Sequence, residues 1–405
     1  FNRIAEQTSF PLLDDETRAF LRVEAGRHRF TMQELRLVSD MALDRMRWKE
    51  TPIQQQWPKV SGKASLLASL RDGHRQLLGK AKSYDGFGAV DKPQTEKPVL
   101  QVQARPRLGL GRCPVASERT RCCNLMTLDA VEKCGFDCSF CSILSFYHGN
   151  AVTFDVNFAG KLDALALDPA RIYHIGTGQS SDSLMWGNHQ GVLDALSRFA
   201  RKHPNVLLEL KTKSRNIAWL VENDYPPNMI CTWSLNPQTI IDHEEHLSAS
   251  LSQRLDAARR IADKGRLVGF HFHPIVHYDN WREDYLQICR EIEERFDPAS
   301  VAMVSLGTLT FTRGVMKTIR RRPLSSKILQ MPMEEIAGKF SYPLETKAEL
   351  FRTVYQGLSG WHRQVFFYLC MEAHSLWKPV FGHEFESNTD LEEAMKSAYM
   401  GKVQA

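Results

Sequence analysis

Six short apolar runs alternate with amphipathic helical stretches in the middle of this 405-residue chain. The runs cover residues 125–130, 171–176, 206–211, 229–234, 267–272 and 301–306, and helical patterns such as 191–202 and 251–264 lie between them. Strands that alternate with helices form a parallel sheet or an open barrel, since each helix returns the chain to the start of the next strand. We therefore predict an α/β fold whose ligand site lies at the C-terminal ends of the strands.

The sequence on either side of these runs has a different character. Residues 1–100 show the apolar spacing of helices and end in a Gly-, Pro- and charge-rich stretch at 80–98. Residues 341–405 combine helical patterns at 345–356 and 390–398 with an apolar run at 364–370 that suits a strand or a buried helix. We expect three regions, namely a helical N-terminal extension with a linker at 1–100, a barrel at 101–340 and a small C-terminal cap at 341–405.

Composition excludes some classes of protein. The 43% hydrophobic and 24% charged residues are ordinary for a soluble globular protein, and a net charge of +5 does not by itself indicate nucleic acid. No window holds the roughly 18 apolar residues of a membrane span, and no basic-then-apolar leader opens the sequence. Six of the nine cysteines fall within residues 113–141, which favours metal or cluster ligation over a disulfide framework. We expect a cytoplasmic protein with no membrane association.

The motif Cys134-x3-Cys138-x2-Cys141 directly follows the first predicted strand. Thiolates are the usual ligands of iron–sulfur clusters, and closely spaced cysteines on one loop can wrap one cluster. Three ligands on a four-iron cluster leave one iron open, which is what a catalytic site needs. The alternative is a structural zinc site, in which a cysteine between 113 and 123 supplies the fourth ligand.

A glycine-containing turn follows the second predicted strand and includes Gly176, Thr177, Gly178, Ser181 and Asp182. Glycines allow the backbone to approach a ligand closely, and the serine and aspartate side chains supply hydrogen bonds. The alternative is a tight strand-to-helix turn in which the aspartate caps the helix.

Further polar candidates end the later strands, and they are Lys211, Lys213, Ser234, Asn236, His271 and His273. A lysine at the end of a barrel strand can neutralise a ligand carboxylate, although a solvated surface lysine is the commoner case. The two histidines are two residues apart, so both side chains point to one face of a strand and can line a barrel lumen. Isolated histidines are more often structural than catalytic.

Together these segments resemble the radical S-adenosylmethionine superfamily and, within it, the spore photoproduct lyase family. The resemblance covers residues 105–380 and rests on motifs in the same order, namely CP, CC, DCSFC, GTGQSSDSL, LKTKS, WSLN, RLDAARRIADKG, GFHFHPI and YLCME. It implies a partial (β/α)6 barrel of the TIM type and a [4Fe–4S] cluster on Cys134, Cys138 and Cys141. It also implies that the open iron chelates S-adenosylmethionine, with Phe140 near the adenine, and that a flavodoxin or ferredoxin supplies electrons. One electron then splits the sulfonium and yields a 5′-deoxyadenosyl radical.

The sequence departs from the family at positions that matter for the reaction. Family members repair a thymine dimer of spore DNA and carry a hydrogen-donating cysteine in the turn where this chain has Gln179. They carry tyrosines where this chain has Phe140 and Ser142, and an aspartate where it has His273. Cys370, in the late YLCME motif, is a candidate replacement donor, and the alternative is a buried structural thiol. The resemblance therefore implies cluster chemistry with an altered final hydrogen transfer.

The substrate predicted for this chain is a thymine-derived base in DNA, acted on by a lyase reaction or by a rearrangement or modification. Two basic stretches, at 105–121 and 313–327, could neutralise phosphates, and the alternative for each is a solvated face. A base would have to leave the duplex to enter a barrel. One further alternative is a radical enzyme that acts on a small molecule or peptide. Another is a non-catalytic, metal-stabilised binding protein, and Cys113, Cys122 and Cys123 either hold an auxiliary metal or pack as small thiols.

Overall fold

A single large sheet dominates the computed structural model, which describes residues 1–88, 98–113, 119–147, 149–336 and 338–405. The strand order is β14-β10-β9-β8-β7-β6-β3-β2, in which β2 is antiparallel to β3 and every other neighbouring pair is parallel. The strands are β2 (Gly109–Arg112), β3 (Met126–Asp129), β6 (Tyr173–Thr177), β7 (Val206–Thr212), β8 (Met229–Ser234), β9 (Val268–Ile275), β10 (Val301–Thr308) and β14 (Phe366–Leu369). All six predicted strands are therefore present in one sheet.

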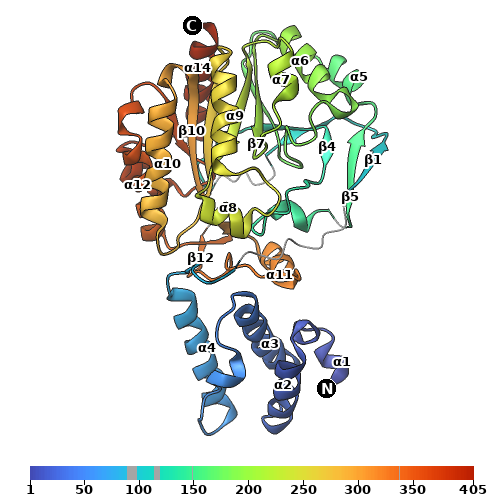
Figure 1. Ribbon diagram of the computed structural model, residues 1–405, viewed down its shortest axis with the longest axis vertical. Coiled ribbons are helices and arrows are strands. Elements are labelled where there is room, and N and C mark those ends of the chain that lie inside the picture. The colour runs from blue at the N-terminus through green and yellow to red at the C-terminus, as the bar shows by residue number, and fades with distance from the viewer. Residues whose placement is uncertain (89–97, 114–118, 148, 337) are drawn as a thin grey trace.

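Helices return the chain between the parallel strands and cover the outer face of the sheet (Figure 1). The helices after β3 are α5 (Phe158–Asp163), α6 (Val192–Lys202), α7 (Ala218–Glu222), α8 (Gln238–Glu244), α9 (Leu251–Asp263), α10 (Trp281–Arg295), α11 (Arg313–Arg321), α12 (Leu344–Gly357), α13 (Trp377–Phe381) and α14 (Asn388–Gln404). A capping box fixes the start of α9, because Ser250 Oγ accepts from the Gln253 amide and the Gln253 side chain accepts from the Ser250 amide.

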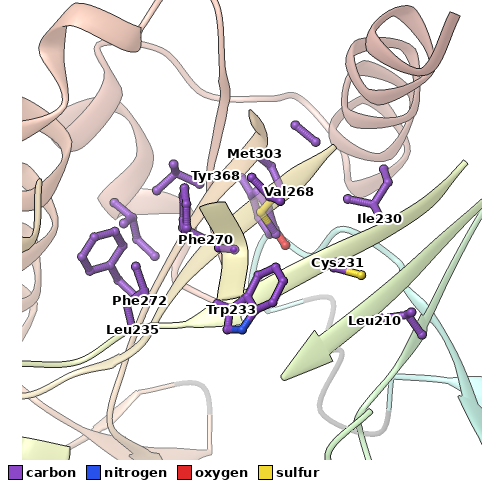
Figure 2. Close-up of a cluster of buried hydrophobic side chains, with 14 of the residues drawn as sticks. Leu210, Ile230, Cys231, Trp233, Leu235, Val268, Phe270, Phe272, Met303 and Tyr368 are labelled. Carbon is purple, nitrogen blue, oxygen red and sulfur yellow. The ribbon is translucent and has the colours of Figure 1, made fainter. Parts of the chain in front are cut away.

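The central strands are buried along their length, so their sequences are apolar runs rather than alternating patterns. Figure 2 shows Trp233 of β8, Phe270 of β9 and Met303 of β10 among the packed side chains of this core. The thiol of Cys231 lies there as well and is fully buried. This packing fixes the strand register that positions the polar strand ends.

The C-terminal region extends the sheet as well as covering it. Strand β14 pairs in parallel with β10, with Met303 opposite Phe366. Past β14 the backbone amide of Arg121 donates to the carbonyl of Glu372 (3.0 Å), which joins the segment before β3 to the segment after β14. The two sides of the sheet thus meet, and the sheet curves around an interior space.

The N-terminal helices have a hydrophobic core of their own. They are α1 (Asn2–Ala5), α2 (Asp15–Arg27), α3 (Met32–Arg47) and α4 (Lys63–Gly79), and they lie below the barrel beside α11 (Figure 1). Leu21, Leu35 and Leu43 are among the residues buried within this core. The Arg320 guanidinium donates to Asp44 Oδ1 (2.7 Å) and so ties α11 to α3.

Two small sheets complete the described structure. One has the order β1-β5-β4 and consists of β1 (Val99–Gln103), β5 (Ala151–Asp155) and β4 (Val131–Glu132). The other has the order β11-β13-β12 and consists of β11 (Thr310–Phe311), β13 (Lys339–Ser341) and β12 (Glu334–Ile336). Across the described residues, the structure holds no helix long and apolar enough to cross a membrane.

Candidate active site

The three clustered cysteines lie on the loop that follows β4. Cys134, Cys138 and Cys141 line one small cavity of about 20 Å³, together with Ile143 and Tyr147. Burial raises the pKa of Cys134 to about 12, and the neighbouring Cys141 thiol contributes to this rise. Three thiols that share one cavity are the donor set that an iron–sulfur cluster requires.

Among the described residues, no three His, Cys, Asp or Glu side chains are grouped so that they could hold a metal ion. The ligands of a four-iron cluster bind different irons, so they surround a larger body than one ion. The cysteine loop therefore suits the cluster in donor type.

Contacts from distant parts of the chain hold this loop. The Ser139 amide donates to the Glu244 carbonyl (2.8 Å), and the Ser139 hydroxyl lies 2.8 Å from His246 Nε2. Arg322, just after α11, donates to the Cys138 carbonyl (3.2 Å) and pairs with Asp137 (2.6 Å). Part of the basic stretch at 313–327 is therefore engaged in positioning the cysteine loop.

A larger cavity of about 520 Å³ occupies the interior of the curved sheet. This volume falls within the range of roughly 300–1,000 Å³ that is usual for small-molecule sites. Ile143 and Tyr147 line this cavity as well as the cysteine cavity, so the two adjoin. The candidate residues that line it are Gly176, Thr177, Gly178, Gln179, Lys211, His271, His273 and Cys370.

The turn after β6 needs its glycines for close packing. Gly178 has a φ of +93°, and a Cβ there would lie 2.7 Å from the Lys211 carbonyl oxygen. A Cβ on Gly176 would lie 2.9 Å from Leu125 Cδ2. The Thr177 hydroxyl lies 2.6 Å from that of Ser183. Because both glycines line the cavity, their bare backbone is open to a ligand there.

The last two residues of this turn are engaged within the protein. The Ser181 hydroxyl donates to the Lys133 carbonyl (2.9 Å). The Asp182 carboxylate accepts from the amides of Leu184, Met185 and Lys213 and from the Thr212 hydroxyl, at 2.7 to 3.0 Å. Asp182 therefore caps the following turn and ties it to β7, and it does not line the large cavity.

Two more candidates meet at Glu245, a buried carboxylate that the sequence did not single out. Lys213 Nζ donates to Glu245 Oε1 (2.6 Å) and lies 5.2 Å from the centre of the Phe140 ring. Asn236 Nδ2 also donates to Oε1 (2.8 Å).

Arg254 binds the second carboxylate oxygen of Glu245 and also contacts the remaining candidate, Ser234. Arg254 pairs with Glu245 Oε2, and it also donates to the Ser234 carbonyl (2.8 Å). Although burial opposes it, the cations of Arg254 and Lys213 lower the pKa of Glu245 to about 2. This network joins the ends of β7 and β8 to the cysteine loop through Phe140.

The two histidines of β9 face the cavity as predicted, and each has partners. Lys211 Nζ donates to His273 Nδ1 (3.1 Å), and His273 Nε2 lies 2.9 Å from the Ser305 hydroxyl. His271 Nε2 lies 2.7 Å from Glu209, and burial lowers the pKa of His271 to about 4. A neutral His271 therefore donates to the Glu209 carboxylate.

The sequence patterns did not identify several residues that line the large cavity. Glu209 lies inside an apolar strand, and its carboxylate also lies 2.8 Å from His174 Nε2. The sequence signal for Glu209 was a charged residue in the middle of the otherwise apolar run LLELK. Tyr368 and Asp129 also line the cavity, as do Cys113, Cys122 and Cys123. Pro114 of the CP motif lies outside the described residues.

Comparison with known proteins supports the fold and the family. Residues 172–347 match the family model of spore photoproduct lyase. The spore photoproduct lyase of Clostridium acetobutylicum is 22% identical over 162 residues, which is 40% of this chain and 47% of that protein. The Geobacillus enzyme is 24% identical over 123 residues, which is 30% of this chain and 36% of that protein. The aligned segments thus span about half or less of these curated relatives.

Solved structures give the same fold over more of the chain. A variant spore photoproduct lyase with bound AdoMet and dinucleoside spore photoproduct has a TM-score of 0.56 at 19% identity, covering 67% of this chain and 82% of that chain. A spore photoproduct lyase complexed with dinucleoside spore photoproduct has a TM-score of 0.55 at 18% identity, with the same coverage. The predicted partial barrel and the predicted resemblance to the spore photoproduct lyase family are both confirmed. The stretch that matches the family model begins after the cysteine loop.

Proposed function

We propose that this chain is a radical S-adenosylmethionine enzyme that acts on a thymine-derived base in DNA, since residues 172–347 match the family model of spore photoproduct lyase. The observation that carries the proposal is the shared wall between the three-cysteine cavity and the 520 Å³ cavity at the strand ends. A cofactor held at the first cavity borders a substrate in the second. The reducing cytoplasm is the compartment that suits thiolate ligands.

Cys134, Cys138 and Cys141 would hold a [4Fe–4S] cluster, which when bound supplies the electron that cleaves S-adenosylmethionine to a 5′-deoxyadenosyl radical. The residues around the loop prepare this site. Lys213 is fixed by Glu245 beside Phe140 and brings a cation toward Cys138. Burial raises the pKa of Cys138, and the charge of Lys213 opposes this rise. The bare backbone of the 176–178 turn and the buried amine of Lys211 offer polar contacts to the bound S-adenosylmethionine.

The exposed face of α11 supports a nucleic-acid substrate. Arg313, Lys317 and Arg321 are exposed and recur every four residues, so they form one cationic stripe, in which Arg313 also pairs with Glu335 (3.1 Å). Thr312 and Val315, at the start of the same helix, line the large cavity. The stripe therefore borders the cavity mouth, where it can neutralise phosphates while one base enters the barrel.

Three other basic residues of the two stretches are paired within the protein. Arg320 and Lys327 pair with Asp44 and Glu50, and Arg105 of the first stretch pairs with Glu132. The DNA proposal consequently rests on α11 and not on the count of basic residues.

The reaction type depends on the hydrogen donor, because this chain lacks the cysteine that family members carry in the turn after β6. Gln179 lines the cavity at this turn, and a carboxamide does not return a hydrogen atom to a carbon radical. We propose two possible outcomes, namely a lyase reaction with another hydrogen donor or a rearrangement in which 5′-deoxyadenosine returns the hydrogen. A flavodoxin or ferredoxin is the proposed electron source.

An anaerobic reaction tests the proposal. The protein is reconstituted with iron and sulfide, reduced with dithionite and given S-adenosylmethionine with or without DNA that contains the spore photoproduct. We expect 5′-deoxyadenosine, measured by mass, and more of it with DNA. Formation that is indifferent to DNA would move the substrate to a small molecule or peptide. No formation from an intact, reducible cluster would leave a metal-stabilised binding protein.

A further inference from the structure

Four thiols form part of the wall of the large cavity, apart from the three of the cysteine loop. They are Cys113, Cys122, Cys123 and Cys370; the first three lie close together in the sequence before β3, and Cys370 follows β14. Ligation of a metal is one chemistry open to such thiols. Thiols in contact with a substrate cavity have a second chemistry available, which is the transfer of hydrogen atoms and electrons.

The backbone brings three of these thiols to the same place. Arg121 and Glu372 form an antiparallel bridge (3.0 Å), which brings Cys122 and Cys123, directly after Arg121, beside Cys370, two residues before Glu372. The Cys370 amide donates to the Leu306 carbonyl (2.8 Å), which holds it at the end of β14. Burial is the main cause of the raised pKa of Cys370, and the nearby Cys113 and Cys122 thiols add to it.

Cys370 and Cys122 differ in protonation in a way that suits two roles. Burial raises the pKa of Cys370, so its sulfur keeps its hydrogen at neutral pH. The Cys123 thiol donates a hydrogen bond to Cys122 and lowers the pKa of Cys122 to about 7. Cys122 is thus available in part as a thiolate, which is the form that bonds to another sulfur.

We infer that Cys370 and Cys122 are a redox pair in which Cys370 gives a hydrogen atom to the substrate radical and Cys122 captures the thiyl radical that remains. The Cys370 S–H bond breaks as a C–H bond forms on the product. The Cys122 thiolate then bonds to the Cys370 thiyl sulfur and gives a disulfide radical anion. Its extra electron passes to a one-electron acceptor of the iron–sulfur or flavin class, and a disulfide remains. A dithiol reductant reopens the disulfide before the next turnover.

This inference rests on the proposed function, since the substrate radical arises there. It explains how a chain with Gln179 in the family turn completes a lyase reaction. Tyr368 is the alternative hydrogen donor, because it lies on β14 two residues before Cys370 and lines the same cavity.

A deuterium experiment distinguishes these donors. The reduced protein is exchanged into D2O and given S-adenosylmethionine and dinucleoside spore photoproduct, and the deuterium in the product is compared with the 5′-deoxyadenosine formed. We expect about one deuterium per product from the natural protein and from Tyr368→Phe, and a loss of at least tenfold in this ratio from Cys370→Ala. A product without deuterium, or an unchanged ratio in Cys370→Ala, would overturn the assignment.

A second measurement does not depend on turnover. Anaerobic protein without a cluster is oxidised with diamide, alkylated, digested and analysed by mass spectrometry. We expect a peptide pair joined through Cys122 and Cys370, absent from Cys122→Ala and unchanged in Cys231→Ala, which removes a core thiol. A disulfide between Cys122 and Cys123 only, or none, would overturn the redox pair. If the pair forms while no 5′-deoxyadenosine appears in the first experiment, the proposed function fails and the thiol pair stands.

Discussion

Replacing Glu245 with glutamine removes the charge that holds Lys213 and Arg254 beside the cysteine loop. The Glu245 side chain is buried and accepts hydrogen bonds from both cations and from Asn236. Glutamine has the same shape, but its amide NH2 group is a hydrogen-bond donor and would face the donor groups that the carboxylate oxygen now accepts from. Breaking a buried pair by removing one partner leaves an uncompensated charge and costs about 3–5 kcal/mol.

The pKa of Glu245 gives an independent magnitude. The value falls from 4.5 to about 2 in the folded protein. Each pKa unit corresponds to about 1.4 kcal/mol, so the shift corresponds to about 3 kcal/mol of folding free energy at pH 7. For a folded domain of this size we expect Glu245→Gln to lower the midpoint of thermal unfolding by roughly 5–10 °C. Glu222→Gln is the control, because that carboxylate is exposed on α7.

The effect has a defined pH dependence. The folded pKa lies below the unfolded one, so the stabilisation is complete above pH 4.5 and disappears as pH falls toward 2. The difference in midpoint between the natural protein and Glu245→Gln should therefore shrink over this interval in calorimetric scans. A midpoint at pH 7 equal to that of Glu222→Gln, or a difference that persists at pH 2, would refute the reasoning.

Three further changes test other parts of the structure. Gly178→Ala should lower the free energy of unfolding in urea by at least about 2 kcal/mol, because the φ of +93° and the carbonyl oxygen 2.7 Å from the new Cβ both oppose it. Asp182→Ala leaves four donors without their acceptor and should cost about 3 kcal/mol in the same assay, with Asp182→Asn recovering part of the loss. If Arg313, Lys317 and Arg321 are all replaced by glutamine, the slope of log affinity for duplex DNA against log salt concentration should fall by roughly 2–3, because three phosphate contacts are lost. An unchanged slope would show that α11 is not part of the DNA-binding surface.

The sequence predicted the barrel because the spacing of apolar residues and the length of each apolar run can be read from neighbouring residues alone. The run 206–211 is apolar because both faces of β7 are buried, and the same holds for the strands beside it. The run at 364–370 stayed ambiguous between strand and helix. It became β14 only through pairing with β10, which is more than fifty residues earlier in the chain.

The candidate site was predictable where a motif is contiguous and less so where partners are distant. Cys134, Cys138 and Cys141 share a loop, so their spacing was enough to predict that they line one cavity. Asp182 and Asn236 were expected at the ligand but bind their own fold, because hydrogen-bonding residues at strand ends serve both purposes. Glu245 could not be identified, since its importance comes from cations on other elements.

The most direct test of the central claim is Mössbauer spectroscopy of the anaerobically reconstituted protein with iron and sulfide quantified. The account predicts a [4Fe–4S] cluster with four irons per chain, whose spectrum changes at one iron when S-adenosylmethionine is added. Cys138→Ala should lose the cluster, while Cys231→Ala should retain it. A tightly bound zinc ion in place of iron, or a cluster that survives in Cys138→Ala, would contradict the account.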